Sequence, residues 1–103
     1  MPCGAPILKS SSVTDMMRVQ AATPSATIPG SGFGFGWAVL VDPTAAKSPQ
    51  SPGTISWGGV YGHTWFVDPA RKLTVVAFTN TTLAGAFWPF PNGVRDAVYA
   101  TNE

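Results

Sequence analysis

Charged side chains are scarce in this sequence. Only 11% of its 103 residues are Asp, Glu, Lys or Arg, whereas typical soluble domains contain about 25%. A small domain exposes much of its surface, so this deficit indicates that part of the surface is covered by another chain or by residues outside this sequence. The six basic and five acidic residues are scattered along the chain and give a net charge of +1. That pattern excludes a basic patch, so we expect no nucleic-acid partner.

Cysteine and histidine each occur once, as Cys3 and His63. One cysteine cannot form a disulfide within the chain, and one histidine with one distant cysteine supplies too few ligands for a metal. We therefore expect no metal and no cofactor. No apolar run approaches the ~18 residues of a membrane span, and the first residues lack the apolar core of a signal peptide. We expect no membrane partner and, by default, a cytoplasmic location, although the compartment stays open.

The first periodic segment of the chain predicts a helix. Val13, Met16 and Met17 recur at helical spacing, and Ser12 and Asp15 have the spacing of a capping box at its start. The helix should end before the proline- and glycine-rich stretch ATPSATIPGSG. The stretch before the helix, MPCGAPILKSSS, is atypical of a native protein start because it leads almost directly into the helix.

The remainder of the chain predicts an antiparallel sheet and a second helix. Strand patterns occur in GFGFGWAVLVD, TISWGG, HTWFVDP and LTVVAFTNT, and Pro69 in DPARK favours a hairpin turn between the last two. Val75 and Val76 point to opposite faces of the last strand, so we expect both faces of the sheet to be covered. A closing helix should follow Asn92 as its N-cap. We predict one α+β domain over residues 1–103, an antiparallel meander of about four strands flanked by an N-terminal and a C-terminal helix.

Two adjacent glycines interrupt a strand pattern in ISWGGVYGHTWFVDP. They indicate either a β-bulge or the close approach of a ligand to bare backbone, and the spacing leaves both readings open. In the same stretch, His63 has no G-x-S-x-G nucleophile to serve, so a structural role is favoured over that of a catalytic base. The glycine-rich GSGFGFG matches no phosphate-binding pattern and predicts a strand packed by aromatic side chains.

Several stretches together resemble one family. SWGGVYGHTWFVDPARKLTVVAFTNT is similar to the C-terminal sheet of serine β-lactamase-like and penicillin-binding-protein-like hydrolases. It most resembles class C β-lactamases and family VIII carboxylesterases, in which W-G-G or H-G-G stands in place of K-T-G. ILKSSSVTDMMRVQ, GFGFGWAVLVD and VRDAVYA resemble the family's preceding helix, glycine-rich strand and closing helix. The resemblance covers about residues 6–100 and implies a partial β-lactamase/transpeptidase-like fold, with this chain as the C-terminal fragment of such a domain.

The resemblance also implies roles for four consecutive residues. Trp57, Gly58 and Gly59 correspond to the third active-site motif, on the strand that lines the catalytic cleft. The backbone N–H of Val60 corresponds to one of two donors that form the oxyanion hole. We call residues 57–60 the WGGV segment.

The catalytic residues of the family are missing from this chain. It contains no Ser-x-x-Lys sequence, and the nearest spacing, Thr44 to Lys47, falls in a proline-rich loop. Neither Tyr61 nor Tyr99 is followed two residues later by Asn, as the family's Tyr-x-Asn motif requires. We therefore predict that the chain holds no catalytic residue and is inactive by itself.

The implied reaction is hydrolysis of a small ester, amide or β-lactam-like acyl substrate through an acyl-enzyme. Two alternatives remain open: an inactive binding or interaction module, and a complementing subunit that needs a second, N-terminal chain to supply Ser-x-x-Lys. We also expect self-association through the strand at residues 73–79. In the family that strand pairs with one from the missing N-terminal part, so its apolar edge is left open here.

Overall fold

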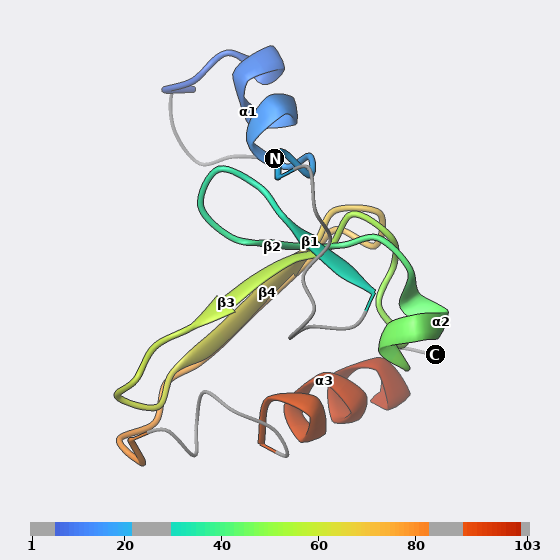
Figure 1. The fold of residues 1–103 in the computed structure, drawn as a ribbon. Helices are drawn as coiled ribbons and strands as arrows, with labels where there is room; N and C mark the ends of the chain where they lie inside the picture. The colour runs from blue at the N-terminus through green and yellow to red at the C-terminus, as the bar shows by residue number, and fades with distance from the viewer. Residues whose placement is uncertain (1–5, 22–29, 83–89, 102–103) are drawn as a thin grey trace.

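The computed structural model describes residues 6–21, 30–82 and 90–101, so Cys3 lies outside the described residues. Figure 1 shows the order and arrangement of the helices and strands. In chain order they are α1 (Ser10–Met16), β1 (Ser31–Phe33), β2 (Ala38–Leu40), α2 (Pro43–Ala46), β3 (Ile55–Gly58), β4 (Thr64–Asp68), β5 (Leu73–Ala77) and α3 (Phe90–Thr101). None of these helices, as far as they are described, is both long and apolar enough to cross a membrane.

The five described strands form one sheet in the order β1-β2-β3-β4-β5, and every neighbouring pair is antiparallel. This confirms the predicted α+β meander. The stretch GFGFGWAVLVD, expected as one strand, contains instead the end of β1, a turn over residues 34–37 and β2. The N–H of Gly34 donates to the carbonyl of Trp37 (2.9 Å) and closes the turn. Glycine is required at position 34 because the backbone after α1 comes close: a Cβ there would lie 2.9 Å from the Arg18 carbonyl oxygen.

The sequence predicts the turn between β4 and β5 correctly, but it does not predict the helix in the loop between β2 and β3. The hairpin turn at Pro69 is confirmed, since the N–H of Lys72 donates to the Pro69 carbonyl (3.1 Å). The loop before β3 contains a helix that was not expected, α2. Its N-cap is Asp42, whose carboxylate accepts hydrogen bonds from the N–H groups of Thr44 (3.1 Å) and Ala45 (3.2 Å), as the N-cap preference for Asp explains.

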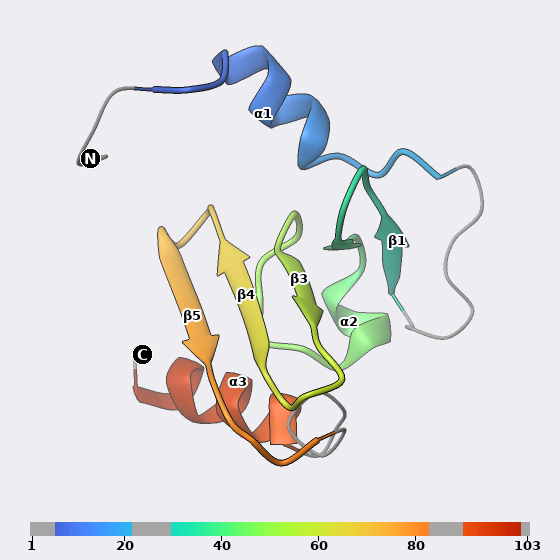
Figure 2. The ribbon, with the colours of Figure 1, turned by 90° about the vertical axis from the view of Figure 1, so that its left-hand side faces the viewer.

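Helix α3 covers one face of the sheet (Figure 2). Phe66 of β4 stacks on Tyr99 of α3 with ring centroids 6.0 Å apart, and both side chains are buried. Val75, the β5 neighbour of Phe66, is half-buried on the same face. The expectation that both faces are covered is wrong at β5, because Val76 and Phe78 on the other face are 54% and 83% exposed. The buried apolar residues are Ala38, Val39, Leu40, Ile55, Phe66 and Tyr99.

Helix α1 lies beyond the other side of the sheet from α3 (Figure 1) and buries none of its residues. It is shorter than expected, and its N-cap is Lys9, without a side-chain hydrogen bond, rather than Ser12. The carboxylate of Asp15 pairs with Arg18 (2.7 Å), so the predicted capping box does not form. The carbonyl of Met16 accepts a hydrogen bond from the indole of Trp37 (2.9 Å), which ties the end of α1 to the β1–β2 turn.

The closing helix begins earlier than the sequence predicts. Helix α3 starts at Phe90, so Asn92 lies inside its first turn and not at the N-cap. The side-chain oxygen of Asn92 accepts a hydrogen bond from Arg95 (3.2 Å), one turn further along. A local pattern of cap and periodicity therefore located this helix correctly but predicted its first residue as Gly93 rather than Phe90, because helix boundaries are the least reliable part of a prediction from sequence.

Candidate functional site

The WGGV segment lies where β3 ends and the turn to β4 begins. Trp57 and Gly58 are the last residues of β3 and pair with β4 in regular antiparallel register. On its other side, β3 pairs with β2 only through Ile55 and Ser56. From Trp57 onward, β3 therefore has β4 on one side and no described strand on the other. This leaves the backbone of the WGGV segment at an open edge.

The turn that follows is closed by two backbone hydrogen bonds. The N–H of Gly59 donates to the His63 carbonyl (3.0 Å), and the N–H of Gly62 donates to the Gly59 carbonyl (3.0 Å). Val60 and Tyr61 are thus the two central residues of a β-turn, in which the closing bond does not use the N–H of the first central residue. Among the described residues, no acceptor is recorded for the N–H of Val60. No residue within 6–21, 30–82 or 90–101 therefore competes with a ligand for that N–H.

An aromatic surface adjoins the turn on the face that α3 does not cover. Trp57 is 48% exposed and packs edge-on against Phe33, with ring centroids 5.3 Å apart. Its cross-strand neighbour Trp65 makes the same kind of contact with Trp37 at 6.0 Å. Both separations lie in the range that favours aromatic pairs. The two strands that lead into and out of this turn therefore carry paired aromatic rings, Trp57 on β3 and Trp65 on β4.

The structure answers the question that the two glycines raise. Gly58 pairs with Thr64 without a bulge. At Gly59, a Cβ atom would lie less than 3.0 Å from three atoms of the His63 imidazole, closer than real Cβ atoms come to other atoms. A side chain of the same chain therefore approaches the bare backbone at Gly59. The resemblance had placed His63 outside the third active-site motif. His63 follows Gly59 by four residues across a short turn, and this spacing is the sequence signal that could have predicted their contact.

The other residues considered from the sequence lie away from the WGGV segment or face another way. Thr44 belongs to α2, which precedes the start of β3, whereas Val60 follows its end. Lys47 is the C-cap of the same short helix, in a left-handed conformation (φ 52°). Tyr99 is buried against the opposite face of the sheet, and Tyr61 is exposed in the turn.

A buried polar network holds α3 to the sheet. Asp68 has no exposed surface, and its carboxylate accepts hydrogen bonds from the Tyr99 hydroxyl and from the N–H groups of Ser51 (3.1 Å) and Arg71 (3.2 Å). Burial raises the pKa of Asp68, but these hydrogen bonds outweigh it and hold the pKa below its ordinary value. Burial, followed by the adjacent carboxylate, raises the pKa of Tyr99. Both shifts favour the paired state, so this network is structural.

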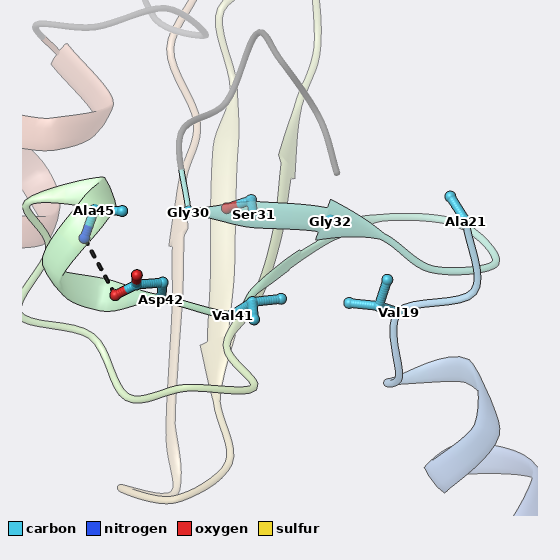
Figure 3. Close-up of a pocket in the computed structure, with 8 residues that line it drawn as sticks. All are labelled: Val19, Ala21, Gly30, Ser31, Gly32, Val41, Asp42 and Ala45. Carbon is cyan, nitrogen blue, oxygen red and sulfur yellow. Dashed lines mark hydrogen bonds between the residues drawn. The ribbon is translucent and has the colours of Figure 1, made fainter. Parts of the chain in front are cut away.

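A surface pocket of about 390 Å³ lies between the segment that follows α1, strand β1 and helix α2 (Figure 3). The side chains of Val19 and Val41 face each other across it, and its charged side chain, Asp42, caps α2. The pocket includes no residue of the WGGV segment. In the described part of the chain, no group of three or more His, Cys, Asp or Glu residues could hold a metal. We assign the candidate site to the WGGV segment, because the N–H of Val60 can donate a hydrogen bond to a ligand, whereas the Asp42 carboxylate in the pocket already accepts hydrogen bonds from Thr44 and Ala45.

Comparison with known proteins identifies the family. Residues 5–98 match the Beta-lactamase family. The chain belongs to this family. It is 50% identical over 90 residues to Esterase EstB of Burkholderia gladioli, which covers 85% of this chain and 23% of that protein. It is 29% identical over 73 residues to Protein Rv1367c of Mycobacterium tuberculosis (strain ATCC 25618 / H37Rv), covering 68% of this chain and 18% of that protein.

A solved beta-lactamase-like structure confirms the partial fold. EstCE1, described as a hydrolase with promiscuous acyltransferase activity, superposes with a TM-score of 0.85 at 45% identity. The match covers 93% of this chain and 26% of that one. The chain thus spans about a quarter of the length of these two esterase and hydrolase relatives.

Proposed function

We propose that this chain is the C-terminal part of a beta-lactamase-like serine hydrolase that acts on esters, and that the WGGV segment supplies its third active-site motif. The N–H of Val60 would be one of the two oxyanion-hole donors. The observation that carries this proposal is the position of that N–H, at the first central residue of a turn beside an open strand edge. Similarity to an esterase supports ester substrates over amides or β-lactams.

The proposed reaction has two steps. A serine from outside this chain attacks the ester carbonyl and expels the alcohol, and water then releases the acid from the acyl-enzyme. In each step, negative charge develops on the carbonyl oxygen, and a fixed backbone N–H stabilises it. The chain has no Ser-x-x-Lys sequence, so the nucleophile and its activating lysine would come from the remainder of the domain.

The test is a chimera in which this chain replaces the matching 90-residue segment of Esterase EstB, assayed with p-nitrophenyl butyrate. We expect the chimera to be active and its Val60→Pro variant to lose about 10²–10³-fold in kcat, as removal of an oxyanion donor does. Proline lacks the N–H and is favoured at the first central position of common turns, so the turn should persist. Full activity of Val60→Pro would refute the role of this N–H.

The isolated chain provides the matching negative control. We expect no turnover of p-nitrophenyl butyrate or nitrocefin above the buffer rate, even at high protein concentration, because the nucleophile is absent. Steady hydrolysis that disappears in the His63→Ala variant would contradict the fragment proposal and indicate a histidine-based site.

A complementing subunit is a second candidate, favoured by the large apolar side chains that this chain leaves exposed, such as Val76 and Phe78. Such a chain would dock onto a second one that supplies Ser-x-x-Lys. Mixing the isolated chain with a separately expressed esterase lacking the matched segment should then restore hydrolysis. If the mixture stays inactive while the isolated chain binds a penicillin-like ligand without turnover, an inactive binding module is supported instead.

Self-association of the isolated chain is a separate proposal. Strand β5 ends the described sheet, and no described strand pairs with its second edge, beside the exposed Val76. Such an edge can pair with that of a second copy and extend the sheet. The low charge of the chain opposes this only weakly.

A further inference from the structure

We infer that His63 is a positioning residue for the oxyanion donor, which it orients through its contact with Gly59. The inference rests on the proposed function of the WGGV segment, because it assumes that the N–H of Val60 contacts the substrate. It assigns His63 neither a proton-transfer role nor contact with the reacting atoms.

The imidazole occupies the space that any side chain at position 59 would need. A Cβ built on Gly59 would lie less than 3.0 Å from Cε1, Nε2 and Nδ1 of His63, with no other residue among its three nearest atoms. The ring is half-buried, and the Phe78 ring lies beside it at a centroid distance of 6.2 Å. Packing of this kind restricts the backbone of Gly59, which would otherwise be the most mobile kind of residue in a chain.

The main chain of His63 contacts the same residue. Its carbonyl accepts the N–H of Gly59 (3.0 Å), so His63 holds Gly59 by a hydrogen bond and by its ring. The far end of the turn is also held, because Gly62 has a φ of 111° and its carbonyl accepts a hydrogen bond from the Thr79 hydroxyl. The turn is therefore anchored at both ends while its two central residues stay exposed.

These contacts determine where the Val60 N–H points. That N–H and the Gly59 carbonyl belong to one planar trans peptide unit, so they point in opposite directions. The Gly59 carbonyl is directed to the N–H of Gly62. The N–H of Val60 must therefore point away from the interior of the turn, and any rotation of the Gly59 backbone would swing it. The His63 ring, which lies against Gly59, limits that rotation.

The first experiment replaces His63 in the EstB chimera. We expect His63→Ala to lower kcat about tenfold, less than complete loss of a donor, with KM within twofold and the melting temperature within a few degrees. His63→Gln, whose planar amide can lie over Gly59, should restore most of kcat. Unchanged kcat in His63→Ala would overturn the inference. The inference would also be overturned if the loss of kcat in His63→Ala equalled the loss of folded protein.

A double-mutant cycle tests the contact itself and does not depend on the His63→Ala variant alone. Gly59→Ala should lower both kcat and stability, because its methyl group collides with the ring. In Gly59→Ala/His63→Ala the methyl group occupies the vacated space, so kcat should be higher than in Gly59→Ala. If the fold-losses in kcat of the two single variants simply multiply to give the loss in the double variant, the two residues do not interact and the inference is overturned.

The Val60→Pro variant separates the two proposals. If Val60→Pro is inactive while His63→Ala is fully active, only the positioning role fails. If Val60→Pro is fully active, the proposed function itself fails.

Discussion

The two faces of the sheet differ in how much of their apolar surface this chain covers by itself. On the face that packs against α3, Phe66 and Tyr99 are 6% and 2% exposed, whereas on the opposite face Trp57 and Val76 are 48% and 54% exposed. The opposite face is buried only at its β2–β3 end, where Val39 and Ile55 are 4% and 5% exposed, and its remaining apolar side chains are exposed as core residues rarely are. The low charge of the sequence thus goes together with apolar side chains that the described residues leave exposed.

The same two faces differ in chemistry. The covered face contains a closed network, in which Asp68 accepts hydrogen bonds from three groups and no described buried side-chain polar atom lacks a partner. The uncovered face carries the WGGV segment, whose Val60 N–H has no acceptor among the described residues. A satisfied network stabilises a fold, while an available donor can stabilise charge on a substrate. The difference therefore separates the structural half of the molecule from the half to which we assign function.

Phenylalanine occurs on both faces and provides the most direct test of this contrast. Truncation of the buried Phe66 to Ala should lower the free energy of unfolding by about 3–5 kcal/mol, since it removes apolar contacts and leaves a cavity. Phe78→Ala, at a position 83% exposed, should change it by less than about 0.5 kcal/mol. Urea unfolding of the isolated chain measures both. Equal losses would show that both faces are covered in solution.

The tyrosines offer a second matched pair. Tyr99→Phe removes the hydroxyl that donates to buried Asp68 and should cost about 1–3 kcal/mol, since the carboxylate loses one of its donors. Tyr61→Phe, in the exposed turn, should cost nothing measurable in the same urea titration. A negligible effect of Tyr99→Phe would mean that the network does not hold α3.

The pH dependence of stability tests the charge state of the network. Because the pKa of Asp68 is lowered in the folded state, its stabilisation is present above the unfolded value of about 3.9 and is lost as pH falls through the folded value. The raised pKa of Tyr99 acts oppositely, with stability lost as pH rises above about 10. We expect the urea midpoint to fall at both extremes. In the Asp68→Asn variant, the urea midpoint should fall less steeply at acidic pH. If its acidic decrease is unchanged, that decrease comes from other carboxyl groups.

The smallest effect should come from charge on the uncovered face. Val76→Lys should weaken self-association of the isolated chain about tenfold, because a lysine beside the β5 edge opposes pairing with a second copy. Ala70→Lys, in the exposed β4–β5 turn, adds the same charge away from the edge and should leave association unchanged. Sedimentation at micromolar concentration compares them. A well-folded monomer of the parent chain, with amides of residues 73–79 protected from exchange, would contradict this proposal.

Local patterns predicted the elements better than their ends. The turn at Pro69 was predicted correctly because proline and its neighbours determine that bend locally. The caps at Ser12 and Asn92 were wrong, since several polar residues near a helix start compete and neighbouring structure selects among them. The β1–β2 turn was missed because alternating glycine and aromatic residues suit either a strand or a reversal.

By itself, the sequence determined the α+β class, the antiparallel meander and the family resemblance, because these follow from hydrophobic periodicity, turn residues and consecutive motif residues. Only the tertiary structure decided which face α3 covers, that His63 fills the space over Gly59, and that Asp68 meets Tyr99 from 31 residues away. Such contacts depend on strand register and side-chain direction in three dimensions, and no local pattern encodes either of them.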